Sequence, residues 1–189
     1  PIRPACKTGP GRALLITLFD KVSQSSALLS LPDQSVRDIA LVNGIIWLLQ
    51  TTHLTAVSAD GQVLYKQRIV AWRNSILHPT EWARSFSVHG DRLYIAHGAL
   101  GVAVFNTRTR KVENWLTKLV KPGSILGDVV VHENKLYALQ GAYHPQGFNG
   151  VSILSLRRPA PVRHVAYHRE SGVVDAYDST MQIDGRYLL

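Results

Sequence analysis

The sequence predicts an all-β fold built from repeated four-stranded antiparallel units, and two features of the stretch Ser85–Leu119 support this prediction. The first is a series of short apolar runs, rich in Val, Ile, Tyr and Phe, which is typical of strands. These runs are Phe86–Val88, Leu93–Ala96, Val102–Phe105 and Val112–Leu116. The second is the shortness of the polar turns between them, which can join only neighbouring antiparallel strands. The stretch therefore has the size and pattern of one β-propeller blade.

The composition indicates a globular protein. The chain has 189 residues, of which 46% are hydrophobic and 18% are charged, and it is long enough to bury a sizeable core. No apolar run approaches the length of a membrane-spanning helix. The single Cys6 excludes an internal disulfide. The net charge of +8 favours acidic partners.

Copies of the same pattern flank the central stretch. The Asn43-Gly44 and Asp60-Gly61 pairs are strong hairpin signals because both accept positive φ. Trp47, Tyr94 and Tyr137 then fall in register on the second strand of each unit. The complete units are expected at residues 36–70, 85–119 and 128–167. The strands expected in the outer two are Asp38–Val42, Ile45–Leu49, His53–Ser58 and Gln62–Val70, then Asp128–Val131, Lys135–Gln140, Gly150–Leu156 and Val162–Tyr167.

Two half units complete the expected propeller segment, residues 13–189, which follows a linker at residues 1–12. Ala13–Asp20 and Ala27–Leu31 resemble the third and fourth strands of a blade, in a half blade at residues 13–31. Thr180–Ile183 and the turn Asp184-Gly185 resemble the start of another, at residues 179–189. About four blades are fewer than most propellers need to close. We favour a fragment of a longer protein, the alternatives being two copies in one ring or a closed four-bladed ring.

Two segments resemble known propeller repeats. Val57–Tyr65, which reads VSADGQVLY, is similar to the third and fourth strands of PQQ-like (quinoprotein-type) blades, and Gly90–Asn106 is similar to LVIVD-type blades. The resemblance implies the propeller fold. It does not imply a bound quinone, so the cofactor stays unassigned. Such blades are frequent in exported bacterial proteins, which favours a periplasmic or extracellular location.

Candidate ligand-binding residues gather where the first strands begin and the second strands end. In a propeller these positions and the adjoining loops, including the Gly141–Asn149 insertion, share one face. The candidates are Asp38, Gln50, Trp72, Arg73, His97, Asp128, Gln140, Tyr143 and His144. Carboxylates and imidazoles at a channel mouth can hold a divalent cation. The alternative, which we favour, is that the aspartates cap loop backbone and the histidines lie partly exposed at the surface. No metalloprotease, nucleophile-elbow or phosphate-loop motif is present.

Basic residues gather at the opposite end of the predicted blades, in the turns between third and fourth strands. They are Arg108, Arg110, Lys111, Arg157, Arg158 and Arg163. Such a patch binds phosphates or an acidic partner, and the alternative is an ordinary solvated turn. No aromatic residue lies among the six, which argues against nucleic-acid binding.

The sequence as a whole favours a non-catalytic binding or scaffold module that recognises a protein or a ligand. Its expected partners are a protein or the remaining propeller blades. The alternative is a propeller enzyme, either a metal-dependent hydrolase or a quinoprotein-type dehydrogenase, with its site at the channel mouth. Whether the chain is an enzyme is left open at this point.

Overall fold

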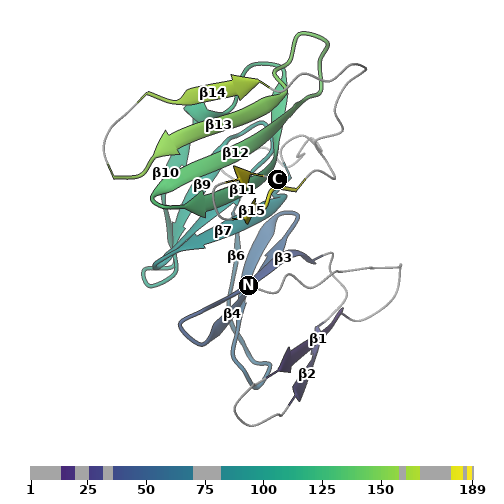
Figure 1. Cartoon of the computed structure of the whole chain (residues 1–189). Coiled ribbons are helices and arrows are strands. Elements are labelled where there is room, and N and C mark those ends of the chain that lie inside the picture. Colours follow the sequence, from purple (N-terminus) through teal and green to yellow (C-terminus); the bar gives the residue numbers. More distant parts are fainter. Residues whose placement is uncertain are drawn as a thin grey trace. The chain divides into compact units, whose positions relative to one another are not determined.

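The computed structural model describes the chain as two compact units, Pro1–Arg68 and Ile69–Leu189 (Figure 1). Within them it describes residues 14–19, 26–31, 36–69, 82–157, 161–166, 180–184 and 187–188. The expected linker at residues 1–12 lies outside these ranges, as do residues 70–81, most of which separate the first two complete units expected from the sequence. Among the described residues, no helix is long and apolar enough to cross a membrane.

The first unit contains a hairpin and one four-stranded antiparallel sheet. The hairpin is β1 (Leu14–Phe19) paired with β2 (Ser26–Leu31). The sheet has the order β3-β4-β5-β6, and its strands are β3 (Val36–Val42), β4 (Ile45–Gln50), β5 (His53–Val57) and β6 (Val63–Arg68). Asn43 and Gly44 have φ of 52° and 77°, as the tight turn expected from the Asn-Gly pair requires.

The second unit contains two four-stranded antiparallel sheets and a short hairpin. The first sheet consists of β7 (Ser85–His89), β8 (Arg92–Ala96), β9 (Val102–Asn106) and β10 (Lys111–Leu116). A 3-10 turn, η2 (Thr117–Leu119), leads to the second sheet. That sheet consists of β11 (Ser124–His132), β12 (Lys135–Ala142), β13 (Gly150–Ser155) and β14 (Arg163–Ala166). The hairpin is β15 (Ile183–Asp184) with β16 (Tyr187–Leu188).

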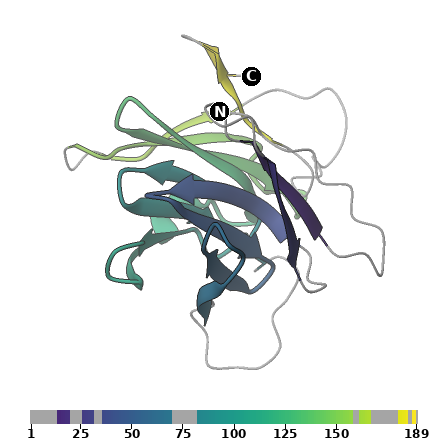
Figure 2. The ribbon, with the colours of Figure 1, turned by 90° about the horizontal axis from the view of Figure 1, so that it is seen from below.

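Apolar side chains from both sheets of the second unit form one core. Tyr94 and Val104 come from the first sheet, and Val129 and Leu136 come from the second. Figures 1 and 2 show the strands β11–β14, in green, as one continuous layer. One face of the first sheet therefore packs against the second sheet, as expected for stacked sheets.

The all-β prediction is therefore confirmed, together with three four-stranded antiparallel sheets joined in sequence order. Among the described residues, the one helical element is the three-residue η2. Trp47, Tyr94 and Tyr137 are each the third residue of β4, β8 and β12. Their equivalence, which the sequence predicted, is present in the register of the three sheets.

Two expected strands differ from those observed. The strand β11 begins at Ser124 instead of Asp128, because pairing with β12 continues across a bulge between Leu126 and Asp128. The expected strand Thr180–Ile183 is wrong: β15 comprises only Ile183 and Asp184. The backbone N–H of Met181 is instead bonded to a side chain of β11, so this part of the segment does not join a strand ladder.

Candidate functional site

Serine hydroxyls on β7 join the two sheets of the second unit. Ser85 Oγ accepts a hydrogen bond from the backbone N–H of Val129 at 3.2 Å, and Ser87 Oγ accepts one from Val131 at 2.9 Å. The donor and the acceptor both advance by two residues in the same direction. The strands β7 and β11 therefore run parallel, side by side, and side-chain oxygens on one bond to the backbone of the other.

Asp128 repeats this contact one sheet further along the chain. Its Oδ1 accepts the N–H of Val129 at 2.8 Å, and its Oδ2 accepts the N–H of Met181 at 2.6 Å. The exposed fractions of Asp128 and Met181 are only 1% and 3%. A buried carboxylate needs such donors to offset its lost hydration. The carboxylate thus fixes the segment before β15 to β11.

Asp38 holds the equivalent position in the first unit. It lies beside a bulge in β3, as Asp128 lies beside a bulge in β11. Its Oδ1 accepts the N–H of Ile39 at 2.8 Å, the counterpart of the bond from Val129 to Asp128. Both bonds go to the next residue within a strand, whereas the sequence favoured capping of loop backbone by the two aspartates.

Gln140, at 0% exposure, is the centre of a buried polar chain. Its Nε2 donates to the carbonyl of Leu119 at 2.8 Å, and its Oε1 accepts the N–H of Lys121 at 2.8 Å. Gln140 Nε2 also bonds to Ser152 Oγ, which lies 2.7 Å from Nδ1 of His164. In the first unit Gln50 Oε1 accepts from Thr55 Oγ1 at 3.1 Å. Gln50 therefore bonds within its own sheet, whereas Gln140 also bonds to η2 and to the link between η2 and β11.

His164 ends this chain. Gln140 Nε2 donates to Ser152 Oγ, which leaves the serine hydroxyl able to donate a hydrogen bond to His164 Nδ1. Burial, with the charge of Lys121 as a smaller cause, lowers the pKa of His164 below its usual 6.5.

His97 is completely buried at the end of β8. Its ring meets Trp115 edge-on, with centroids 5.5 Å apart. Its backbone N–H donates to Gly101 at 2.8 Å, and its carbonyl accepts from Leu100 at 2.9 Å. The backbone of His97 therefore closes the β8–β9 loop by two hydrogen bonds, and its ring packs in the interior.

The inserted loop Gly141–Asn149 is held to the β11 end of the sheet. Ser124 Oγ accepts the N–H of Phe148 at 2.6 Å and donates to its carbonyl at 3.0 Å. Asn149 Oδ1 accepts the N–H of Ala142 at 2.8 Å. A Cβ on Gly147 would lie 2.1 Å from the carbonyl oxygen of Gly123, so only glycine fits this approach.

Of the candidate ligand residues in the second unit, the loop exposes two. Tyr143 is 49% exposed, and His144 is exposed beside it. Asp128, Gln140 and His97 lie in the interior. No group of three or more His, Cys, Asp or Glu side chains suited to a metal occurs among the described residues. Trp72 and Arg73 lie outside the part of the chain that the structure describes.

Basic residues gather at the other end of the second unit, where β7–β8, β9–β10, β11–β12 and β13–β14 turn. Because β7 and β11 are parallel, all four turns lie at the same end of their sheets. We call this set the basic end. In the described turns it consists of Arg92, Arg108, Arg110, Lys111, Lys135, Arg157 and Arg163. Arg158 lies outside the described residues.

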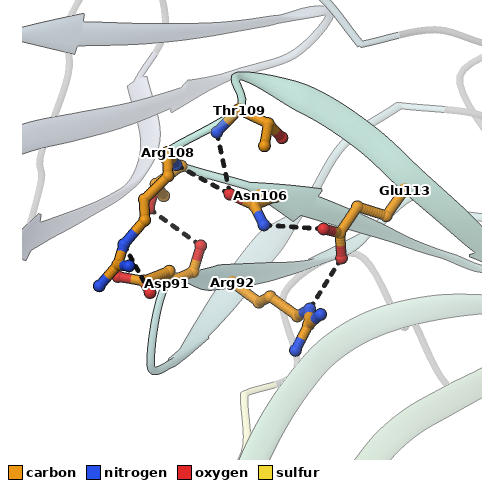
Figure 3. A network of polar contacts seen from close by, with 7 residues as sticks. Asp91, Arg92, Asn106, Arg108, Thr109 and Glu113 are labelled. Carbon is orange, nitrogen blue, oxygen red and sulfur yellow. Dashed lines mark hydrogen bonds and ion pairs between the residues drawn. The ribbon is translucent and has the colours of Figure 1, made fainter.

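Two arginines of the basic end are paired with carboxylates (Figure 3). Arg108 Nε lies 2.8 Å from Asp91 Oδ2, and Arg92 Nε lies 2.8 Å from Glu113 Oε2. Asn106 joins the network, because its Nδ2 donates to Glu113 Oε1 at 2.7 Å. These bonds from Arg92 and Asn106 lower the pKa of Glu113.

Asp91, Asn106 and Glu113 were not predicted from the sequence as partners of the basic residues. The strand register brings them together. Arg92 lies directly opposite Asn106 on β9, and Asn106 lies opposite Lys111 on β10. Cross-strand neighbours on one sheet face interact in this way.

Comparison with known proteins supports the fold class alone. No protein-family model matches the sequence, and no curated protein matches it. The structure is similar to that of the computationally designed Ika4 protein, with a TM-score of 0.52 and 11% identity over 85% of this chain and 86% of that one. A weaker similarity, with a TM-score of 0.48 and 18% identity, is to PorZ, a surface component of the type-IX secretion system of Porphyromonas gingivalis. It covers 75% of this chain but only 18% of PorZ.

Proposed function

We propose that this chain is a propeller-type scaffold that binds a partner without catalysing a reaction. The observation that carries the proposal is the structural role of Asp128, whose two oxygens accept hydrogen bonds from the buried backbone N–H groups of Val129 and Met181. A carboxylate that binds two backbone donors in this way stabilises the fold. In the second unit, the polar residues along the first strands thus bond each sheet to the sheet or segment that follows it.

The repetition of this kind of bond supports the propeller arrangement. Ser85 and Ser87 accept hydrogen bonds from backbone N–H groups of β11, and Asp128 accepts one from the segment that leads into β15. Within the second unit, each four-stranded sheet is thus joined through its first strand to the sheet or segment that follows it in the sequence. This is the relationship expected of successive blades around an axis. The compartment that we propose, from the resemblance to exported repeats, is the periplasm or the cell exterior.

The Ser152–His164 pair does not supply a nucleophile. Its 2.7 Å spacing resembles that of a catalytic serine with its base. However, Ser152 is 0% exposed and also bonds to Gln140. A substrate has no access to this hydroxyl, so the pair is a structural link between β13 and β14.

Metal analysis tests the proposal against the enzyme alternative. We expect the purified protein to contain much less than one equivalent of zinc, calcium or iron. We also expect that adding Ca²⁺, Zn²⁺ or pyrroloquinoline quinone leaves the melting temperature unchanged, since a ligand that binds the folded state raises it. One equivalent of metal that is lost in Asp128→Asn and His97→Gln variants that still fold would overturn the scaffold proposal.

A further inference from the structure

We propose that the basic end of the second unit docks an acidic segment of a partner protein. The inference rests on the proposed function, because it names the partner of the scaffold. It concerns a surface distinct from the Gly141–Asn149 loop, which lies at the opposite end of the sheets.

The charges of the basic end lie at one end of the two joined sheets of the second unit. The bonds from Val129 to Ser85 and from Val131 to Ser87 fix β7 and β11 in parallel. The turns of the two sheets therefore present their basic residues together. Opposing them are Asp91 and Glu113, which are paired within the network, and Glu133 in the β11–β12 turn.

Positive charge predominates at the basic end. Arg92 and Arg108 form ion pairs with Glu113 and Asp91 at 2.8 Å. Against the seven basic residues stand three carboxylates, those of Asp91, Glu113 and Glu133. The other five basic residues are exposed: Arg110, Lys111, Lys135, Arg157 and Arg163.

The side-chain types at the basic end indicate the chemistry of the partner. Three of the five residues are arginines, whose guanidinium groups bind carboxylates in a bidentate manner. No Phe, Tyr or Trp occurs in the described turns of the basic end, so it lacks the stacking platforms of single-strand binders. An Asp- and Glu-rich peptide segment is the occupant that fits a surface with fixed charges and no aromatic residue.

The experiment measures binding of a fluorescent peptide with alternating Glu and Gly, containing eight glutamates, by anisotropy in 50 mM salt. The first variant combines Arg110→Gln, Lys111→Gln, Arg157→Gln and Arg163→Gln. The matched control removes the same charge elsewhere, through Arg37→Gln, Lys66→Gln, Arg68→Gln and Lys118→Gln. All four control positions are exposed, and circular dichroism checks that both variants fold.

We expect the basic-end variant to bind the peptide at least tenfold more weakly, and the control no more than about threefold, because screened long-range charges contribute less than contacts. Glu113→Gln should bind about twofold to threefold more tightly, since it releases Arg92. Equal losses in both variants would mean attraction by net charge and would overturn the proposal. Tighter binding of a single-stranded oligonucleotide of eight phosphates than of the peptide would also overturn it. Neither outcome involves the metal content, which tests the scaffold function separately.

Discussion

The carboxylate of Asp128 and the backbone N–H of Met181, 53 residues apart in sequence, are joined by a hydrogen bond of 2.6 Å. Both residues are buried. Met181 lies in no strand, and this bond connects the second sheet of the unit to the segment that follows it. It is the third of a series of side-chain-to-backbone ties that begins with Ser85 and Ser87.

Replacing Asp128 by Ala should destabilise the protein by about 1–3 kcal/mol, because the buried N–H of Met181 loses its acceptor while that of Val129 keeps Ser85 Oγ. Asp128→Asn should cost less, since one oxygen remains. Urea denaturation measures both. Glu133→Gln, at an exposed turn position, is the control and should change the free energy of unfolding by less than about 0.5 kcal/mol. An alanine variant as stable as the control would contradict the structural role of Asp128.

Removing both β7 hydroxyls, with Ser85→Ala and Ser87→Ala, should lower stability by about 1–3 kcal/mol, since each bond contributes about 1 kcal/mol. Thr109→Ala, in the exposed β9–β10 turn, is the matched control. Amide hydrogen exchange at Val131 should accelerate in the double variant alone, whereas the amide of Val129 keeps its bond to Asp128. Unchanged exchange at Val131 would show that Ser87 does not join the sheets.

Gly147→Ala should displace the inserted loop, because the new Cβ would meet the Gly123 carbonyl oxygen at 2.1 Å and the Ala142 Cβ at 2.7 Å. The amides of Tyr143 and His144, which donate to Gly123, should then exchange faster. At Gly90 the added Cβ would meet nothing within 4 Å. Gly90→Ala should therefore leave those two amides protected, and faster exchange in both variants would argue against a local effect.

The lowered pKa of His164 predicts a loss of stability in acid. Its folded-state pKa lies below the ordinary value of 6.5, so the unfolded chain takes up a proton first as the pH falls. The contribution of His164 to stability is therefore complete above about pH 6.5 and is lost as the pH falls toward the folded-state pKa.

The free energy of unfolding, measured from pH 7.5 to pH 5, should fall less in His164→Gln than in the parent chain. The pKa of His53 is also lowered, by burial and by Lys66 and Arg68. His164→Gln leaves the contribution of His53 unchanged, so the stability of this variant should still fall somewhat in acid. Equal slopes for the parent and the variant, or a measured pKa of His164 above 6.5, would contradict this account.

Strand pattern and turns could be predicted from the sequence because they depend on local signals. Asn43-Gly44 adopts the positive φ expected of a tight hairpin turn, and the uninterrupted apolar run Val102–Phe105 is buried on both faces of its strand. For Asp128 the sequence favoured backbone capping but could not identify the partner, because Met181 lies 53 residues away in the sequence. The pairing of Glu113 with Arg92 depended on a bulge between Val112 and Asn114, which shifts register without a clear sequence signal.

The most direct test of the sheet-joining role is residue-resolved hydrogen exchange at the Met181 amide, in the parent chain and in Asp128→Ala. The account predicts that this amide is protected in the parent chain to nearly the same degree as the ladder amides of β12. In the variant its protection should fall by at least tenfold while β12 remains protected. Rapid exchange of Met181 in the parent chain, or unchanged protection in the variant, would contradict the claim that Asp128 joins successive sheets.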